Sequence, residues 1–229
     1  MARNFAMVID LHKCVGCSGC DIACKSENNL RDDFHWSNHI IETAGTFPDV
    51  RYRYVPVLCN HCEVAPCVET CPTTAMHKDE DGITMHDPDI CIGCRACQLA
   101  CPYGAIYFND KAPHGEYRQD TALIAGGTAT GRETAEKAGA PIPYYNPDRA
   151  NTHDGIRRKG IVEKCTFCDH RTKQGLKPWC VEACPAQARI FGDLNDPKSE
   201  VRQLVAKHTP HVLQADKGTR PKVYYIRDY

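Results

Sequence analysis

The chain has 229 residues, and its 28 basic and 29 acidic side chains leave a formal net charge of −1. No strong block of either sign is present, so nothing in the sequence indicates a nucleic-acid partner. The sixteen cysteines are far more than an ordinary chain of this length carries. They come in tight C-x2-C groups in a chain that is not short, which disfavours a disulfide framework.

The first expected element is a strand over residues 5–10, where "FAMVID" is β-rich. No secretory signal is visible before it. A membrane-spanning helix needs about 20 apolar residues, and every apolar run in the sequence is much shorter. We therefore expect no direct membrane span. The strand leads into the first cysteine run, spaced C-x2-C-x2-C-x3-C, and a helix is expected to start within it, over residues 20–29.

Three more cysteine runs follow along the chain. A β-rich segment at residues 51–57 leads into the second run, spaced C-x2-C-x4-C-x3-C-P, and a D-G turn within residues 78–84 predicts a short hairpin after it. The third run repeats the first spacing and adds a proline, and the fourth is spaced C-x2-C-x11-C-x3-C-P. The remaining predicted helix starts, which carry the last cysteines of these runs, are residues 68–71, 97–101 and 181–184.

The runs repeat beyond the cysteines themselves. "IDLHKCVGC" before the first run resembles "HDPDICIGC" at the third, while "CPTTAM", "CPYGAI" and "CPAQAR" close the second, third and fourth. The first and third runs are thus one type and the second and fourth another. This pattern predicts a duplicated unit of two runs.

The segments after the third run differ in character. Residues 104–110 and 188–194 are β-rich, whereas residues 111–162 hold no cysteine and predict a long connection with one short helix near Arg132 to Ala138. We expect this connection to dock another subunit. The β-rich tail "TRPKVYYIRDY" is either a final strand or a docking arm.

The last cysteine of a run points to a second site. It lies four residues after its neighbour, so on a helix both sulfurs share one face about 6 Å apart along the axis. In two-cluster ferredoxins the fourth cysteine of such a run binds the other cluster. The second and third runs are separated by only 19 residues and favour each other. The alternative, first with second and third with fourth, remains open on the sequence.

The spacing favours iron over zinc. Structural zinc sites usually join two separated C-x2-C pairs, whereas two runs here place three thiolates in seven residues and three runs end in C-P. Sixteen cysteines suffice for four 4Fe-4S clusters, and none of the ligand positions carries another residue type. Such clusters offer no free iron to a substrate, so the chain is expected to conduct electrons and to be no enzyme on its own.

Several polar residues near the cysteines are candidates for a supporting role. The histidines at positions 35, 39, 61 and 170 are interpreted as surface residues or as residues behind the ligands. Four basic residues could raise a cluster potential by charge or by hydrogen bonds to sulfur, and the sequence does not rank them. They are Lys25, Arg95, Lys164 and Arg171.

The cysteine runs resemble the four-cluster electron-transfer subunit of the molybdopterin oxidoreductases related to dimethyl sulfoxide reductase. The resemblance covers about residues 5–108 and 161–195. It implies an α+β fold of two bacterial-ferredoxin-like modules with two 4Fe-4S clusters each, one nested within the other, with a long loop insertion. The outer module would take residues 1–50 and 161–205, the inserted module 51–110, the loop insertion 111–160 and the C-terminal tail 206–229.

The same resemblance implies a ligand set for each cluster. The first, nearest the catalytic subunit, would be held by Cys14, Cys17, Cys20 and Cys184. The second would be held by Cys24, Cys165, Cys168 and Cys180. The third would be held by Cys59, Cys62, Cys67 and Cys101, and the last by Cys71, Cys91, Cys94 and Cys97. Cys24 departs from the pattern because Lys25 follows it where the other runs have proline.

Within the family, "HWSNHI", "TAGTFPDV", "LCNHCEVAPCV" and "EKCTFCDHR" look most like the small subunit of respiratory arsenate reductase and its arsenite-oxidising relatives. The implied partners are a large catalytic subunit, which would hold the molybdenum bis-pterin cofactor, and a quinol-oxidising membrane subunit or a cytochrome. Polysulfide, thiosulfate and tetrathionate reductases are alternatives. A free-standing polyferredoxin is an alternative of another class. The implied location is the periplasm by co-export with the catalytic subunit, with the cytoplasm as the alternative.

Overall fold

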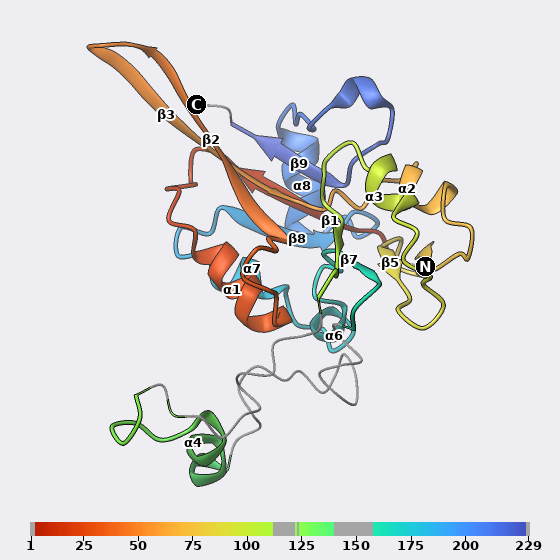
Figure 1. The fold of residues 1–229 in the computed structure, drawn as a ribbon. Helices are drawn as coiled ribbons and strands as arrows, with labels where there is room; N and C mark the ends of the chain where they lie inside the picture. Colours follow the sequence, from red (N-terminus) through yellow and green to blue (C-terminus); the bar gives the residue numbers. More distant parts are fainter. Residues whose placement is uncertain (1–2, 112–121, 123, 140–157, 228–229) are drawn as a thin grey trace.

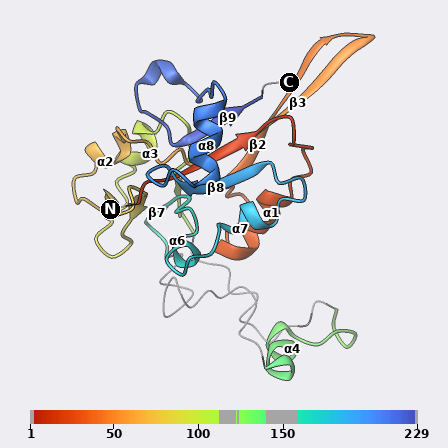
Figure 2. The ribbon, with the colours of Figure 1, turned by 180° about the vertical axis from the view of Figure 1, so that it is seen from behind.

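The computed structural model describes residues 3–111, 122, 124–139 and 158–227. Its strands are β1 (Phe5–Asp10), β2 (Ser37–Thr46), β3 (Asp49–Leu58), β4 (Met76–Lys78), β5 (Thr84–His86), β6 (Tyr107–Phe108), β7 (Val162–Glu163), β8 (Arg189–Asp193) and β9 (Val223–Ile226). Its helices are α1 (Gly19–Asn28), α2 (Pro66–Glu69), α3 (Ala96–Ala100), α4 (Gly131–Ala138), α6 (Asp169–Thr172), α7 (Trp179–Glu182), α8 (Glu200–Lys207) and the 3-10 helix η2 (Ala215–Lys217). The observed class is a mixture of short helices and short strands around the cysteines (Figures 1 and 2).

A three-stranded sheet ties the two ends of the chain together. β1 lies in its centre, antiparallel to β8 and parallel to β9. Side chains alternate between the faces of a strand. Met7 and Ile9 accordingly pack with buried cysteines, while Ala6 and Val8 form a separate core beneath α8. The strands expected at residues 5–10 and 188–194 are both present, and this sheet places the first cysteine run beside the fourth.

The most prominent feature outside the body is the β2–β3 hairpin, which projects from it in Figure 1. The strand predicted at residues 51–57 is confirmed within β3, but its partner β2 was not predicted. The two strands pair over ten residues, from Ser37 with Leu58 to Thr46 with Asp49. Nearly every residue from 40 to 52 is exposed, so the outer part of the hairpin packs on no other described element.

The ligand helices are shorter than expected in three of the four runs. α2, α3 and α7 end before Cys71, Cys101 and Cys184, so the prediction that these last cysteines ride on helices over 68–71, 97–101 and 181–184 is wrong. The reason is the proline that follows each of them, because the residue before proline is pushed out of the helical region. Cys101 is indeed extended, with φ −76° and ψ 111°.

The first run lacks that proline and behaves differently. Lys25 follows Cys24, and α1 continues to Asn28, so Cys20 and Cys24 both lie on one helix as predicted. The helix ends where Asn29 adopts the left-handed conformation and donates its N–H to Lys25 O. The one departure from the C-P pattern therefore produces the longest helix that carries cysteines in the described structure.

The cysteine helices pack in two pairs. α1 lies against α7 at one end of the body, and α2 lies against α3 at the other (Figures 1 and 2). The predicted hairpin is present as β4–β5, closed by Asp79, whose side chain accepts a hydrogen bond from the Ile83 N–H at 2.7 Å. The strand expected at 104–110 shrinks to β6, which pairs with β7 just ahead of the fourth run.

The C-terminal segment is a final strand rather than a free arm. β9 joins the central sheet, and the residues before it cross the loop of the second cysteine run. There the Glu63 and Val64 N–H groups donate to Arg220 O at 2.9 Å and Thr219 O at 3.1 Å. Tyr103 and Thr219 also join their hydroxyls at 2.6 Å. This segment holds the second run in place.

The predicted helix near Arg132 to Ala138 is confirmed as α4. Most of the surrounding connection, residues 112–121, 123 and 140–157, lies outside the described residues. Its expected role in docking another subunit stays a prediction.

Candidate metal centres

Four cysteines from two runs line one cavity near α2 and α3. Cys59 and Cys62 lie in the loop after β3, Cys67 lies on α2, and Cys101 follows α3. Burial raises the pKa of Cys67 to about 12, and the neighbouring thiols of Cys59, Cys101 and Cys62 add to the rise. The structure thus brings together the four residues of the predicted third set, three from the second run and the last from the third.

A second cavity collects the remaining cysteines of those two runs. Cys71, Cys91, Cys94 and Cys97 line it. Burial raises the pKa of Cys97 to about 11, with contributions from the thiols of Cys71, Cys91 and Cys94. Each of the two cavities is lined by four cysteines from the same two runs, as expected if each holds the same kind of group.

A third group forms between α1 and the fourth run. Burial raises the pKa of Cys24 well above its ordinary value, and the thiols of Cys165, Cys180 and Cys168 raise it further. The Asn28 side-chain amide spans two members, with Nδ2 at 3.6 Å from Cys24 Sγ and 3.8 Å from Cys168 Sγ. Cys24 therefore turns away from the loop that precedes it and faces cysteines some 140 residues further along the chain.

The remaining set includes one exposed cysteine, Cys17. A Cβ built on Gly19 would lie 3.5 Å from Cys17 Sγ and 3.8 Å from Ala183 O, so the first loop faces the turn that carries Cys184. Cys14 and Cys20 both interact with His39. The structure places the four members, Cys14, Cys17, Cys20 and Cys184, at the junction of the first loop, α1 and the end of α7.

The chemistry of these sets fits a metal cluster rather than free thiols. Four thiols that raise one another's pKa cannot all ionise without cations among them, and a coordinated thiol is deprotonated outright. Three backbone N–H groups already donate to sulfur in the second and fourth runs, as such groups do to cluster ligands. These are Met76 to Cys71 at 3.4 Å, Phe167 to Cys165 at 3.4 Å and Ala188 to Cys184 at 3.2 Å.

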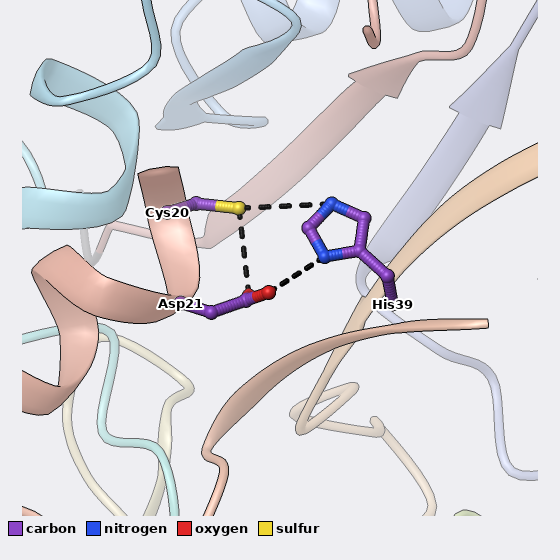
Figure 3. A group of neighbouring side chains, drawn as sticks. All are labelled: Cys20, Asp21 and His39. Carbon is purple, nitrogen blue, oxygen red and sulfur yellow. Dashed lines mark hydrogen bonds and ion pairs between the residues drawn. The ribbon is translucent and has the colours of Figure 1, made fainter. Parts of the chain in front are cut away.

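A polar group beside the first set was not predicted as a unit (Figure 3). His39, on β2, places Nδ1 at 2.6 Å from Asp21 Oδ2 and Nε2 at 3.9 Å from Cys20 Sγ. A mononuclear metal could use these three side chains. However, the hydrogen bond to Asp21 raises the pKa of His39 to about 11, so its ring carries protons on both nitrogens and donates to Asp21 and Cys20.

The other histidines next to cysteines lie behind the ligands and not on the surface. His61 is fully buried and stacks on Phe167 with ring centroids 3.7 Å apart. His170 is buried and places Nε2 at 2.8 Å from Glu27 Oε1. These partners are 106 and 143 residues away in sequence, so no local pattern could have identified them.

The four basic residues named in the sequence analysis differ in how closely their side chains approach the cysteines. Lys164 is 1% exposed, and its ammonium donates to the carbonyls of Thr84 and Cys165. Lys25 instead donates to main-chain carbonyls after α1, Arg95 lies over the Phe108 ring, and Arg171 pairs with Glu182. Lys78 was missed, although its ammonium donates to Cys62 O. Burial beside Lys222 lowers the pKa of Lys78 to about 8.

Among the described residues, no helix has both the length and the apolar character needed to cross a bilayer.

Comparisons with known proteins show which kind of domain the chain contains. The model of the 4Fe-4S dicluster domain matches residues 50–122 and 116–194. The chain is 54% identical over 227 residues to the arsenate respiratory reductase iron-sulfur subunit ArrB of Shewanella sp. (strain ANA-3), covering 99% of this chain and 97% of that protein. It is 41% identical to a selenate reductase subunit of Mesobacillus selenatarsenatis, over 97% of this chain and 72% of that protein. A polysulfide reductase chain of Wolinella succinogenes is 31% identical, over 99% of this chain and 95% of that protein.

Proposed function

Because the chain belongs to the family of four-cluster iron-sulfur subunits of molybdopterin oxidoreductases, we propose that it serves a reductase of the respiratory arsenate type. It carries four 4Fe-4S clusters and transfers electrons. In the proposed complex the electrons pass between a molybdenum bis-pterin catalytic subunit and a quinol or cytochrome partner. The observation that carries the proposal is the convergence of cysteines from separate runs, in sets of four, in a chain 54% identical to an arsenate respiratory reductase subunit.

This convergence supports a proposal for the ligands of each cluster. The proposed sets are those given above, in which the first run shares its clusters with the fourth and the second shares its clusters with the third. Support comes from the two cavities, from the thiols that face Cys24, and from the contact of α1 with α7 and of α2 with α3. This sharing amounts to one ferredoxin-like module nested within another, because the first and fourth runs enclose the other two along the chain.

The cluster content is tested on the anaerobically purified native complex. Iron, acid-labile sulfide and molybdenum are measured against the amount of this chain. Four clusters require about sixteen irons per chain, with molybdenum in the same fractions. Four zincs without sulfide would refute the cluster assignment. Sixteen irons without any associated molybdenum protein would instead indicate a free-standing polyferredoxin.

The substrate class is tested separately. The same complex is supplied with a reduced viologen and with arsenate, selenate, polysulfide, thiosulfate or tetrathionate in turn. We expect arsenate to reoxidise the viologen, and the reconstituted chain alone to reduce none of them, because its clusters leave no iron position free. Activity with a sulfur compound and not with arsenate would transfer the proposal to that reductase class.

The surface around the first set is proposed to face the catalytic subunit. Cys17 is exposed, and the apolar side chains of Val15 and Ile22 beside it are 65% and 67% exposed. The β2–β3 hairpin continues this surface with Ile41 at 63% and Phe47 at 91% exposure. A two-stranded hairpin is at best marginally stable alone in water. A partner that covers the hairpin would therefore stabilise it and bring its own cofactor close to the first cluster.

This contact is tested by co-purification. Ile41→Ser combined with Phe47→Ser should release the catalytic subunit while the chain keeps its iron. The matched control is Leu99→Ser, an equally exposed apolar site beside the third run, which should leave the association intact. An unchanged yield of the complex with the hairpin variant would refute the contact.

The location is proposed to be the periplasm, reached together with the catalytic subunit. The resemblance to co-exported subunits supports it. Fractionation of cells that express the whole complex tests it, and recovery of the chain in the cytoplasmic fraction together with active catalytic subunit would contradict it.

A further inference from the structure

A buried arginine lies between two of the proposed clusters. Arg189 is the first residue of β8 and is 2% exposed. Its neighbour Ile190 packs into the core beneath α8. Because side chains alternate along a strand, Arg189 points to the other face of the sheet, toward α1 and α7.

The guanidinium is only partly satisfied by the protein. Nη2 donates to Ser37 Oγ at 2.8 Å, whereas Nε and Nη1 have no hydrogen-bond partner among the described residues. The nearest carboxylate is already engaged, because Asp21 accepts from Ser37 Oγ at 2.8 Å and from His39 Nδ1 at 2.6 Å. A permanently charged group buried without a direct counter-ion is costly unless something else supplies the negative charge.

Arg189 interacts with Asp21, with Tyr225 and with cysteines of two different proposed clusters. Burial alone would lower the pKa of Arg189, but the thiols of Cys180 and Cys20 raise it above its ordinary value. In the opposite direction, burial raises the pKa of Cys180 to about 12 and Arg189 counteracts that rise. Cys20 belongs to the proposed first set and Cys180 to the second, so one cation is adjacent to both.

We propose that Arg189 is the shared counter-charge of the first and second clusters and that it raises the reduction potential of both. This inference rests on the proposed cluster assignment. A cluster held by four thiolates is anionic and gains a further negative charge on reduction, so a fixed cation beside it favours the reduced form. Arg189 stays protonated throughout, and one electron leaves one cluster as its neighbour accepts it, with no proton transferred.

The sharing has a consequence for electron transfer. A cation next to only one cluster would lower the energy of the electron there and hinder its departure. Arg189 stabilises the electron on either side, so it raises both potentials without separating them. Its placement on β8, which pairs with the central strand β1, and its hydrogen bond to Ser37 keep this relation fixed while partners bind elsewhere.

The test is a redox titration of the holo complex monitored by electron paramagnetic resonance. Arg189→Met removes the charge, Arg189→Gln removes it but keeps an amide donor for Ser37, and Arg189→Lys keeps the charge. The control, Arg202→Met, makes the same charge change on α8, which covers the opposite face of the sheet. Iron and sulfide are counted for every variant.

We expect both neutral variants to lower the midpoint potentials of two clusters, each by at least about tenfold in the ratio of reduced to oxidised form, or about 59 mV. The midpoint potentials of the other two clusters should stay at their wild-type values. All four potentials should be unchanged in Arg202→Met, and most of them should be unchanged in Arg189→Lys. Full iron content with four unchanged midpoints in Arg189→Met would overturn the inference and leave the cluster assignment standing. Absence of iron from the wild-type chain would refute the assignment itself.

A folding defect would not hide the answer. Should both neutral variants lose iron, Arg189→Lys decides, because it restores the charge without the shape of the guanidinium. Retention of iron in Arg189→Lys supports the counter-charge. If Arg189→Lys loses as much iron as the neutral variants, the side chain matters only for packing, and the counter-charge inference is overturned.

Discussion

Two of the four cysteine runs lie at the surface and two lie in the interior. In the first and third runs, here the outer runs, Cys17 and Cys94 are exposed. In the second and fourth, the inner runs, the opening C-x2-C pairs are entirely buried. The spacing C-x2-C is identical in all four, so the spacing sets ligand geometry and not depth.

The residues between the paired cysteines account for the difference. Val15 and Ile92 of the outer runs are both 65% exposed, whereas His61 and Phe167 of the inner runs are 0% and 1% exposed. The third position of each C-x2-C has a positive φ, from 42° to 67°. The outer runs use glycine there, while the inner runs hold an aromatic ring in this strained conformation, which costs about 1–3 kcal/mol. The stacking of His61 on Phe167 offsets that strain.

This division suits a conductor of electrons. In the proposed assignment, the clusters of the outer runs would meet partners through exposed apolar residues, and those of the inner runs would be shielded from water. Buried clusters need compensating charge, and the buried Lys164 and the half-buried Lys78 do lie beside the inner runs. The comparison therefore predicts different responses to the same substitution at inner and outer positions.

The largest difference is expected between Cys165→Ser and Cys94→Ser. Cys165 belongs to the main hydrophobic core, so loss of its cluster leaves a buried polar gap and should lower the melting temperature by on the order of 10 °C, since about 1 kcal/mol corresponds to about 2–4 °C at this size. Cys94→Ser should lose the fourth cluster but keep most of the stability. Calorimetry with iron analysis measures both. Equal losses of stability would contradict the division into inner and outer runs.

The glycines of the outer runs are expected to rank next. A Cβ on Gly93 would meet the backbone oxygen of Gly160 at 1.9 Å, and one on Gly16 would meet the movable Tyr54 ring at 2.5 Å. Gly104 has a similar φ but nothing within 4 Å. Gly104→Ala should cost only the conformational strain of about 1–2 kcal/mol. Gly16→Ala should lower the free energy of unfolding by more than this, and Gly93→Ala should lower it most. Denaturant unfolding measures all three variants. A Gly93→Ala variant as stable as Gly104→Ala would show that the third run can shift.

These cases also show what the sequence could reveal. The strands at residues 5–10 and 188–194 and the short hairpin were predictable, because alternation and the D-G turn are local signals. The strand β2 could not be predicted. Both of its faces are exposed along most of its length, so its sequence shows no alternation of buried and exposed residues. The helices predicted to carry Cys71, Cys101 and Cys184 end earlier in the structure, because a proline follows each of these cysteines.

The candidate site divides in the same way. That the cysteines act as ligands followed from their spacing, but which run shares ligands with which did not, because the partners are brought together by the β8-β1-β9 sheet and by α1 against α7. No local sequence pattern marks the buried Arg189 or the half-buried Lys78. Charged residues are usually exposed, so a sequence gives no reason to expect these inside.

The inner aromatic pair should give a moderate effect. Phe167→Leu removes the ring that stacks on His61 and also contacts Phe191 at 5.3 Å between centroids. We expect a loss of about 1–3 kcal/mol in the free energy of unfolding, with full iron content. Phe47→Leu, at the exposed tip of the hairpin, is the control and should leave the stability unchanged. A loss at position 47 as large as that at position 167 would be inconsistent with the burial difference.

The smallest effect on stability should come with the clearest effect on partners. Ile22 and Leu99 follow the third cysteine of the first and third runs by two residues and are 67% and 87% exposed. Exposed substitutions usually change stability by less than about 0.5 kcal/mol, so Ile22→Ser and Leu99→Ser should unfold like the wild type. If the outer runs serve different partners, Leu99→Ser should slow reduction of the clusters by the quinol or cytochrome, and Ile22→Ser should slow only their oxidation by the catalytic subunit. Rapid-mixing measurements of the two half-reactions separate these effects. Identical behaviour of the two variants would mean that the two exposed ends do not have separate roles.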